Sequence, residues 1–561
     1  MKILSIHADK LIVEPQKKAI SHAEELKTKK EEFKECLVIF TAVERSDEAN
    51  VEEISRKAAD EIYNIANQVK CKIIVLYPYA HLSSDLASPK TALEVLKETE
   101  KELQKKKLNV TRIVFGWYKS FDIKCKGHPL SELSREIKLE SVSTKYDHKQ
   151  LLKEVSKSKL DKSKLKDNDH RILGQAMDLF SFNDMAPGIA FWHSNGLIIY
   201  NELVNYKREL YREFNYQEIS TPQILDSKIW KISGHWEHFK DKMFLTQYEK
   251  RDFGIKPMNC PGAILVYKTT NRSYKDLPLR LGEIGIVHRQ ELSGVLAGLL
   301  RVVRITQDDA HIFCSEGHLE DELNTLIKLV KLMYDKFKFE FRAELSTRPD
   351  KAMGDLKAWD KAEKILSDAL KKNKIDFKIN KGDGAFYGPK IDFHIKDSLN
   401  RSWQMGTIQL DFLMPERFDL TYANKEGKDS RPIIIHRVIY GSLERFIGII
   451  LEHYNGHLPL WLMPIQVRII SFTAKNVKYG EKVFSTLNES GIRVDRDFGT
   501  DRMQAKVREA ALEKVPYIIV VGDKEEKNKT VAIRTKDGKT KYEVKLDSFV
   551  KDIKEEILLR K

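Results

Sequence analysis

A chain of 561 residues is too long for one ordinary domain, and a hydrophobic content of 42% is enough for several cores. The sequence has no run of about 18 apolar residues, so we expect no membrane-spanning helix. Its five cysteines are odd in number and far apart, which indicates a reducing, cytoplasmic compartment and excludes a disulfide framework. The formal net charge of +14 favours a polyanionic partner, although a Lys-rich solvated surface gives the same excess of charge.

The first 138 residues alternate strand and helix patterns. Strands are predicted at 2–8, 36–43 and 73–80, and amphipathic helices at 52–69 and 90–107. Residues 111–128, TRIVFGWYKSFDIKCKGH, are predicted as a hairpin-like pair of strands. We therefore expect a compact α/β domain over residues 1–138, followed by a Lys-, Ser- and Asp-rich linker over residues 139–170.

The composition changes after the linker. Residues 171–461 are rich in aromatic side chains, turns and short strands. Residues 462–561 show β-α-β-α-β periodicity, with the strand patterns VRIISFT, IRVDRDF and PYIIVVG separated by two helical patterns. Strands that alternate with helices predict a doubly wound, mostly parallel sheet in this last domain.

Three residues of the middle region are candidate metal ligands. Cys260 lies in KPMNCPG, His311 in TQDDAHIF and His436 in PIIIHR. One thiolate and two imidazoles suit zinc, and three protein ligands leave a coordination position open for a substrate. The spacing contains no short ligand pair, however, and each residue taken alone is more often a buried core side chain.

Two further segments are candidate phosphate sites. In HRQE, Arg289 beside Glu291 could neutralise an α-phosphate while the carboxylate orients a nucleotide, although a surface ion pair gives the same pattern. The segment GSLERFIGIILEHY is predicted as an amphipathic helix that opens with glycine. Arg445 near its start suits a phosphate contact at a helix N-terminus.

Together these segments resemble a known family. STPQIL, HRQE with its following loop, and GSLERFIG look like the three signature motifs of class II aminoacyl-tRNA synthetases. KPMNCPG, LPLRLGEIG, TQDDAHIFC, GDGAFYGPKIDF, WQMGTIQLDF and IIIHR are similar to threonyl-tRNA synthetases, and VPYIIVVGDKE resembles their anticodon-binding domain. The resemblance implies an α/β and α+β multidomain chain, with a catalytic core on an antiparallel sheet over 171–461 and an anticodon-binding α/β domain over 462–561.

The resemblance also implies an activity, ATP-dependent attachment of threonine to tRNA(Thr) through a threonyl-adenylate by a homodimer, with Mg2+ accompanying ATP. It implies these roles, given by residue: zinc ligands Cys260, His311 and His436; threonine-binding Gln307, Asp309, Tyr387 and Gln409; ATP-binding Arg289, Glu291, Arg301, Gln404 and Arg445; catalytic Arg289, Lys390, Arg445 and His235. On the C-terminal domain, Arg502 and Lys506 are candidate RNA contacts, with a solvated helix face as the alternative.

A zinc ion that binds the amine and the hydroxyl of threonine rejects valine but accepts serine, since one missing methyl is worth only about 1–3 kcal/mol. A second, hydrolytic site for seryl-tRNA is therefore expected. Residues 1–138 resemble the editing domain of archaeal-type threonyl-tRNA synthetases, a relative of D-aminoacyl-tRNA deacylases, in IHAD, YPYAHLSS and GWYKSFDIKCKGHPLSELS. The match implies an editing pocket lined by His81, Tyr118, Lys119 and Glu132, with His128 nearby. A lysine lying over aromatic rings is the alternative reading of Lys119.

Three positions depart from the family pattern. Ala263 and Ala297 stand where His is usual, and Val303 stands where Arg is usual. These changes keep open a catalytically impaired paralogue that edits seryl-tRNA in trans or binds RNA as a regulator. A prolyl- or seryl-tRNA synthetase is a further alternative, and the Cys/His/His set argues against the prolyl one.

Overall fold

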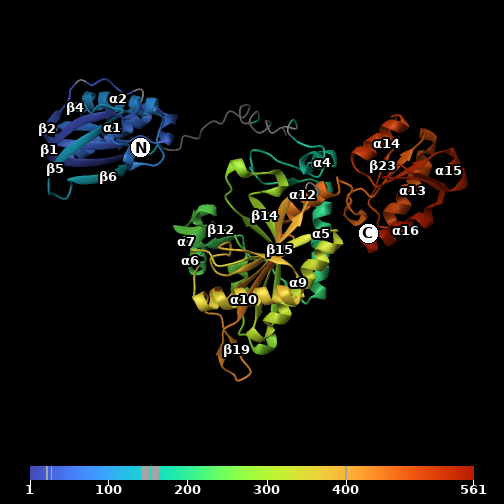
Figure 1. The fold of residues 1–561 in the computed structure, drawn as a ribbon. Coiled ribbons are helices and arrows are strands. Elements are labelled where there is room, and N and C mark those ends of the chain that lie inside the picture. Colours follow the sequence, from blue (N-terminus) through green and yellow to red (C-terminus); the bar gives the residue numbers. More distant parts are fainter. Residues whose placement is uncertain are drawn as a thin grey trace. The chain divides into compact units, whose positions relative to one another are not determined.

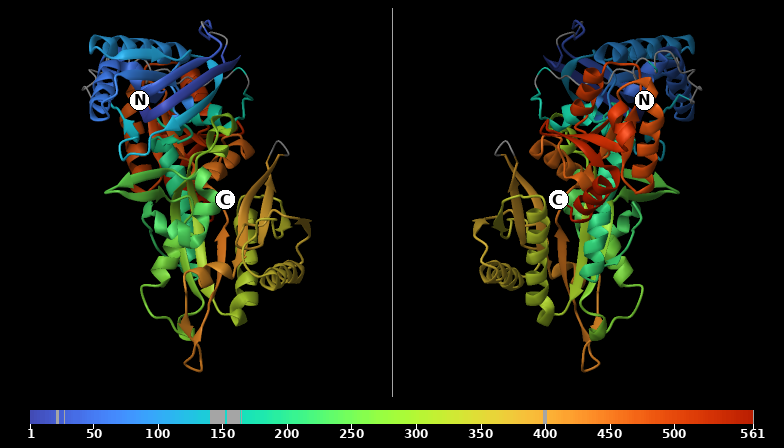
Figure 2. Two further views of the ribbon diagram at one scale, coloured as in Figure 1. Left: turned by 90° about the vertical axis from the view of Figure 1, so that its left-hand side faces the viewer. Right: turned by 90° about the vertical axis from the view of Figure 1, so that its right-hand side faces the viewer.

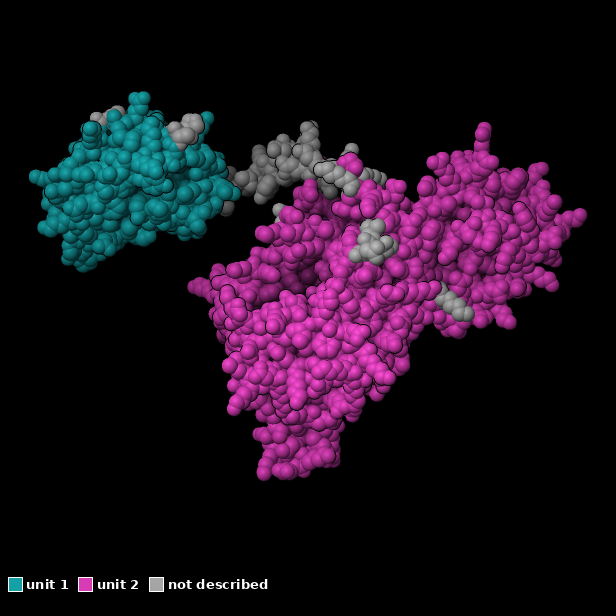
Figure 3. All heavy atoms as spheres, in the orientation of Figure 1, with its two compact units in different colours: residues 1–148 teal, residues 149–561 magenta. Residues whose placement is uncertain are grey.

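The computed structural model describes residues 1–20, 23–26, 28–139, 152, 163, 165–397 and 401–560. They form two compact units, residues 1–148 and 149–561, which Figure 3 colours separately. The predicted linker at 139–170 lies mostly outside the described residues. Among the helices of the described chain, none has both the length and the apolar character needed to cross a membrane.

The N-terminal unit is a six-stranded sheet with two helices packed on one face (Figure 1). The strand order is β4-β3-β2-β1-β5, and β6 also pairs with β1. Its elements are β1 (Lys2–Lys18), β2 (Glu31–Ala42), α1 (Val51–Gln68), β3 (Ile73–Pro78), α2 (Pro89–Lys105), β4 (Asn109–Arg112), β5 (Trp117–Cys125) and β6 (Glu132–Glu136). Because side chains alternate along a strand, Leu37 and Ile39 of β2 pack against the helices, whereas Val38 and Phe40 join a second cluster on the opposite face.

The hairpin predicted at 111–128 is wrong. The strands β4 and β5 lie at opposite ends of the sheet, where β4 runs parallel to β3 and β5 runs antiparallel to β1. Local alternation identifies strands but not their partners. The α2 crossover returns the chain beside β3, and the long β1 offers its free edge to both β5 and β6.

The second unit is built around an eight-stranded sheet of order β16-β15-β17-β18-β21-β14-β13-β9. All its pairings are antiparallel except β13 with β9 and β15 with β16. The antiparallel core implied by the family resemblance is therefore confirmed. The strands are β9 (Gln217–Glu218), β13 (Leu279–His288), β14 (Arg304–Cys314), β15 (Phe341–Ser346), β16 (Phe377–Asn380), β17 (Lys390–Lys396), β18 (Ser402–Asp411) and β21 (Ile433–Val438).

Four helices cover one face of this sheet (Figure 1 and Figure 2). They are α5 (Ser194–Glu213), α9 (Leu319–Lys336), α10 (Leu356–Lys372) and α12 (Leu443–His453). Every second strand residue, such as Ile312, Ile408 and Ile435, packs into the core that they share. The residues between them project from the other face, so the side chains of several strands meet there.

The remaining elements of this domain are shorter. They are α4 (His170–Ala176), β7 (Phe180–Ser181), β8 (Phe191–Trp192), β10 (Ile224–Asp226), α6 (Ser227–Ser233), α7 (His235–Phe239), β11 (Leu245–Tyr248), β12 (Arg251–Ile255), α8 (Cys260–Tyr267), α11 (Leu413–Arg417), β19 (Tyr422–Ala423) and β20 (Asp429–Ser430).

The last hundred residues form a five-stranded sheet of order β23-β22-β24-β25-β26 with four helices. Its elements are β22 (Val467–Ser471), α13 (Val477–Glu489), β23 (Val494–Asp497), α14 (Met503–Leu512), β24 (Tyr517–Val521), α15 (Asp523–Asn528), β25 (Thr530–Thr535), β26 (Thr540–Lys545) and α16 (Leu546–Leu558). The first three strands are parallel as predicted, but β25 and β26 are antiparallel, so the sheet is mixed. Asp537 and Gly538 (φ +80°) form the turn between β25 and β26, a sequence typical of hairpins.

Candidate functional site

A cavity of about 410 Å³ opens on the uncovered face of the eight-stranded sheet. Side-chain alternation builds it, because Gln307, Asp309 and His311 are every second residue of β14 and all three line the cavity. Eleven residues with predicted roles line it: Cys260, Arg289, Gln307, Asp309, His311, Tyr387, Lys390, Gln404, Gln409, His436 and Arg445.

Cys260, His311 and His436 form a cluster in this cavity, with one candidate ligand atom from each lying within 4.8 Å of the others. All three are buried. Burial, together with Asp309 and Asp411, raises the pKa of the Cys260 thiol, and burial beside His436 and Arg437 lowers the pKa of His311.

His436 has a partner that suits a metal ligand. Its Nε2 lies 2.9 Å from Asp411 Oδ2, which leaves Nδ1 free, and a carboxylate on the second nitrogen is typical of metal-bound imidazoles. A thiol and two imidazoles at this separation fit a zinc ion with one open position.

A carboxylate stands beside this cluster. Asp309 Oδ2 accepts a hydrogen bond of 3.1 Å from Asn259 Nδ2, and burial raises the pKa of Asp309 to about 6. Gln409, from the neighbouring strand β18, donates to the Gly388 carbonyl at 3.2 Å. The ring of Tyr387 lies 5.5 Å from that of His436. Carboxylate, amides and phenol together form a polar site for a small ligand that carries an ammonium group.

Two guanidinium groups also line the cavity. Arg289 donates to the Pro257 carbonyl at 3.1 Å and faces the ring of Phe239 at 5.6 Å. Arg445, in the first turn of α12, donates to the Leu300 carbonyl at 2.8 Å. Burial lowers the pKa of both groups, and neither is paired with a carboxylate among the described residues. Half-buried cations of this kind suit a polyanionic ligand.

The remaining predicted ATP residues lie beside these cations. Arg301 Nη2 and Glu291 Oε2 form an ion pair of 2.8 Å that does not line the cavity. Gln404 Nε2 donates to Asp392 Oδ1 at 2.6 Å, and Lys390 Nζ donates to Oδ2 of the same carboxylate at 2.7 Å. Asp392 therefore fixes two cavity side chains from two adjacent strands.

His235 is not brought into the cavity. It is fully buried, with Nδ1 2.7 Å from Ser233 Oγ and Nε2 2.9 Å from Met258 Sδ. Burial lowers the pKa of His235 to about 3. Its contact with the cavity is indirect, through Met258 and the ring of Tyr387, which both line it.

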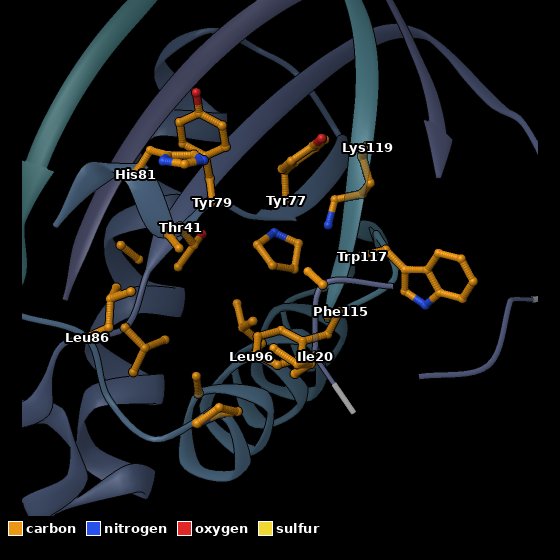
Figure 4. Close-up of a pocket in the computed structure, with 18 of the residues that line it drawn as sticks. Ile20, Thr41, Tyr77, Tyr79, His81, Leu86, Leu96, Phe115, Trp117 and Lys119 are labelled. Carbon is orange, nitrogen blue, oxygen red and sulfur yellow. The ribbon is translucent and has the colours of Figure 1, made fainter. Parts of the chain in front are cut away.

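A second cavity, of about 320 Å³, lies within the N-terminal unit (Figure 4). Of the predicted editing residues, His81, Tyr118 and Lys119 line it. Its other walls are mainly apolar or aromatic: Ile20, Leu86, Leu96, Phe115, Trp117 and Phe121 are among them. Figure 4 shows Lys119 pointing from β5 into this space beside Tyr77.

Lys119 is the cationic side chain of this cavity. Its Nζ donates to the Val114 carbonyl at 3.0 Å and lies 5.1 Å from the centre of the Tyr77 ring. Burial lowers its pKa to about 8. About half of the Lys119 amine is therefore neutral near pH 8, where an exposed lysine is almost entirely protonated.

The structure does not place His128 and Glu132 in this cavity. His128 Nε2 lies 2.9 Å from His7 Nδ1 on β1. Glu132 accepts from the Cys125 thiol at 3.4 Å at the start of β6. His128 lies in the connection between β5 and β6 and Glu132 begins β6, so both follow the strand that carries Lys119 but contact other partners.

Three residues that orient cavity side chains were not predicted. Asn259, Asp392 and Asp411 orient Asp309, Lys390 and His436 respectively. A signal was available for the two carboxylates, because Asp392 follows Lys390 by two residues and Asp411 follows Gln409 by two, which places each pair on one face of a strand. On α14, Lys506 is buried and donates to the Gly499 carbonyl at 2.6 Å, so its prediction as an RNA contact is wrong.

The three departures from the family pattern lie in packing, not in the cavity lining. Ala263 is fully buried in α8, and Ala297 packs against the main core. Val303 is 8% exposed, and its backbone N–H donates to the Gly188 carbonyl at 2.7 Å.

Comparison with known proteins agrees with this arrangement. A family model for the archaea-specific editing domain of threonyl-tRNA synthetase matches residues 1–137. A model for the tRNA synthetase class II core domain (G, H, P, S and T) matches 242–454, and an anticodon binding domain model matches 466–556.

Curated relatives include the threonine--tRNA ligases of Acetivibrio thermocellus, 51% identical, and Caldanaerobacter subterraneus, 50% identical, each over 392 residues. These matches cover 70% of this chain but 62% and 61% of the relatives, so the chain spans less than two thirds of their length.

A crystal structure described as the RNA binding domain of threonyl-tRNA synthetase from Cryptosporidium parvum is 41% identical, with a TM-score of 0.67. The match covers 69% of this chain and 98% of that one. With its editing domain, class II core and anticodon-binding domain, the chain belongs to the threonyl-tRNA synthetase family.

Proposed function

We propose that the chain attaches threonine to tRNA(Thr) in two steps, formation of threonyl-adenylate from ATP and transfer of threonine to the tRNA. One observation carries the proposal: a single cavity holds a Cys/His/His cluster, the Asp309 carboxylate and the half-buried side chains of Arg289 and Arg445. An amino acid and a nucleoside triphosphate therefore have complementary groups within one site.

Cys260, His311 and His436 would hold zinc, which supplies a Lewis acid with a position open to the substrate. The chain's own groups then bind the rest of threonine. Asp309, beside Asn259, is placed to accept a hydrogen bond from the substrate ammonium, while Gln307, Tyr387 and Gln409 enclose the small side chain.

In the first step a carboxylate oxygen of threonine attacks the α-phosphorus of ATP, and the bond to the departing pyrophosphate breaks. Charge develops on the α-phosphate oxygens, where Arg289 and Arg445 are placed to stabilise it, and Mg2+ accompanies the other phosphates. Lys390, held by Asp392, lies close enough to the cavity to contact the reacting carboxylate.

A charging assay tests this function. The full-length protein, tRNA(Thr), ATP and threonine should give threonyl-tRNA, and threonine should stimulate pyrophosphate exchange. A chelator that removes zinc should reduce both activities. A protein that hydrolyses seryl-tRNA but neither charges threonine nor exchanges pyrophosphate would instead be an editor acting in trans.

We further propose that the N-terminal unit hydrolyses seryl-tRNA. Support comes from the match to the archaeal editing-domain model and from the cavity that contains Lys119. The amine could hold the attacking water or the terminal ribose at the ester. Incubation of the protein with seryl-tRNA and threonyl-tRNA tests this, since faster loss of serine is expected and equal rates would contradict it.

The assembly and location belong to the same proposal. A homodimer in the cytoplasm is expected, with its interface near the first signature motif. Light scattering on the purified protein measures its mass directly, and a mass near 65 kDa, that of one chain, would contradict the dimer.

A further inference from the structure

A buried histidine at the start of α4 connects three segments beside the catalytic cavity. His170 is 1% exposed. Its Nδ1 lies 2.7 Å from Glu452 Oε1 on α12, and its Nε2 accepts the backbone N–H of Leu299 at 3.0 Å. Because Nε2 accepts, Nδ1 carries the ring proton and donates it to Glu452.

The loop at 298–300 approaches this imidazole so closely that glycine is required. Gly298 has a φ of +55°, and a Cβ there would lie 2.3 Å from His170 Nε2. On the other side, a Cβ at Gly448 of α12 would lie 3.1 Å from Leu300 Cδ2. This short 3-10 turn is therefore closely packed between α4 and α12.

Glu452 also anchors a second segment. Its carboxylate forms an ion pair with Arg401, at the start of β18. Arg401 and the Trp403 indole both donate to Asp397 Oδ2, at 2.5 and 2.8 Å, and the Arg401 guanidinium faces the Trp403 ring at 5.2 Å. Burial opposes ionisation of Glu452, but the hydrogen bonds from His170 and the charge of Arg401 lower its pKa.

Both anchored segments hold Arg445. The Leu300 carbonyl accepts Arg445 Nε at 2.8 Å, and the Gln404 carbonyl accepts Nη1 at 3.2 Å. The Trp403 ring lies 5.9 Å from the guanidinium carbon. Arg445 is thus fixed from two sides, and both sides lead back to Glu452, one through His170 and the other through Arg401.

We propose that His170 and Glu452 are positioning residues that set the guanidinium of Arg445 for ATP. The inference rests on the proposed function, because it takes Arg445 as a phosphate contact. Neither residue lines the cavity, so both act through Arg445 and through Arg301, which follows Leu300. A displacement of about 1 Å in such a group costs on the order of 10²-fold in rate.

The same residues could be taken for a metal site, since Asp169, His170 and Glu452 present atoms within 4.8 Å of one another. The contacts argue against it. Asp169 is bound to Arg171 at 2.8 Å, Glu452 to Arg401, and both nitrogens of His170 have protein partners. The cluster is already satisfied without an ion.

Two substitutions at His170 separate positioning from packing. His170→Phe keeps a ring but loses both hydrogen bonds, whereas His170→Gln keeps a donor and an acceptor. Leu173→Val, in the same helix and equally buried, is the matched packing control. In threonine-dependent pyrophosphate exchange, His170→Phe should lower kcat/KM for ATP about 10-fold or more, with the KM for threonine nearly unchanged. His170→Gln should recover most of the activity, and Leu173→Val should match the native chain.

Equal losses toward ATP and threonine, or native kinetics in a folded His170→Phe protein, would overturn the proposal. If His170→Phe does not fold, two other variants change the same contacts. Glu452→Gln changes the acceptor of the His170 Nδ1 proton, and Gly298→Ala places a Cβ against His170 Nε2. The unfolding midpoint of each variant is measured as well. Direct titration with ATP by calorimetry gives a readout independent of turnover. A native chain that binds ATP but charges no tRNA would contradict the proposed function while leaving the ATP comparison among variants intact.

Discussion

The two cavities of this chain differ in the contact partners of their charged side chains. In the catalytic cavity, three charged or polar groups have side-chain partners: His436 has Asp411, Lys390 has Asp392 and Asp309 has Asn259. The guanidinium groups of Arg289 and Arg445 there donate to backbone carbonyls instead. In the N-terminal cavity, Lys119 contacts a backbone carbonyl and an aromatic ring. The first arrangement suits charged substrates held in one geometry, and the second keeps one amine near its protonation midpoint.

Removing a ligand from the Cys/His/His cluster should have the largest effect and should separate the cavities. Cys260→Ala is expected to lose bound zinc and to lower threonylation by about 10²–10³-fold, as when one pre-organised electrophilic group is lost. Zinc analysis and charging assays measure this. Cys314→Ala, at an equally buried cysteine in the main core, is the control. Seryl-tRNA hydrolysis should stay unchanged in both variants, and its loss in Cys260→Ala would show that the cavities are not independent.

A smaller effect is expected from substitution of Asp411, which contacts His436 of the cluster. Asp411 Oδ1 accepts the backbone N–H groups of Leu413 and Met414, while Oδ2 faces His436 Nε2. Asp411→Asn can keep the first contacts but presents an amide donor to the imidazole. The ring proton then moves to Nδ1, the nitrogen that a metal ion needs free. We expect zinc affinity to fall about 10–100-fold, measured by competition with a chromophoric chelator. Unchanged affinity would mean that His436 binds no zinc.

The longer helices and strands and most residues of the catalytic cavity could be predicted from the sequence, because both depend on local sequence pattern. Alternation along β14 places Gln307, Asp309 and His311 together, and the family motifs named them. What it missed depends on contacts between distant segments. Nothing near residues 111–128 indicates that β4 and β5 separate, because their partners β3 and β1 lie far away in sequence.

Tertiary contacts also explain why three side chains lie elsewhere than the sequence predicted. His235 was expected near the reacting groups, but Ser233 and Met258 hold its ring inside the protein. His128 turns to His7, a partner 121 residues away. Lys506 is drawn inward by the Gly499 carbonyl. Each of these side chains is held by hydrogen-bond partners that a linear motif does not specify.

The next largest effect is expected on seryl-tRNA hydrolysis, from substitution of Lys119 in the N-terminal cavity. Lys119→Met retains the length and apolar stem of the side chain but removes the amine. Seryl-tRNA hydrolysis should fall about 10-fold or more, while threonylation stays native. Lys124→Met, in the same strand, is the control, since that lysine is exposed and faces Asp9 at 3.3 Å. Undiminished serine clearance by Lys119→Met would remove Lys119 from the editing site.

The smallest expected effect is on stability, and its sign follows from the pKa. Burial lowers the pKa of Lys119 from 10.5 to about 8. Between these values the unfolded chain binds more protons than the folded one, so the native unit gains stability as pH rises from about 8 to 10.5. At pH 7 the folded unit keeps a poorly solvated ammonium, which Lys119→Met removes. The variant should therefore be more stable at pH 7, by on the order of 1 kcal/mol, with a smaller difference at pH 9.5.

Urea-dependent pulse proteolysis of the full-length protein, followed through peptides from residues 1–137, measures this difference. Lys124→Met should show no such gain, because its ammonium is already in water. If Lys119→Met destabilises the unit at pH 7, the contacts of the amine with Val114 and Tyr77 outweigh its lost solvation. Lys119 would then be a structural residue, and the difference between the two cavities would be one of shape rather than of charge.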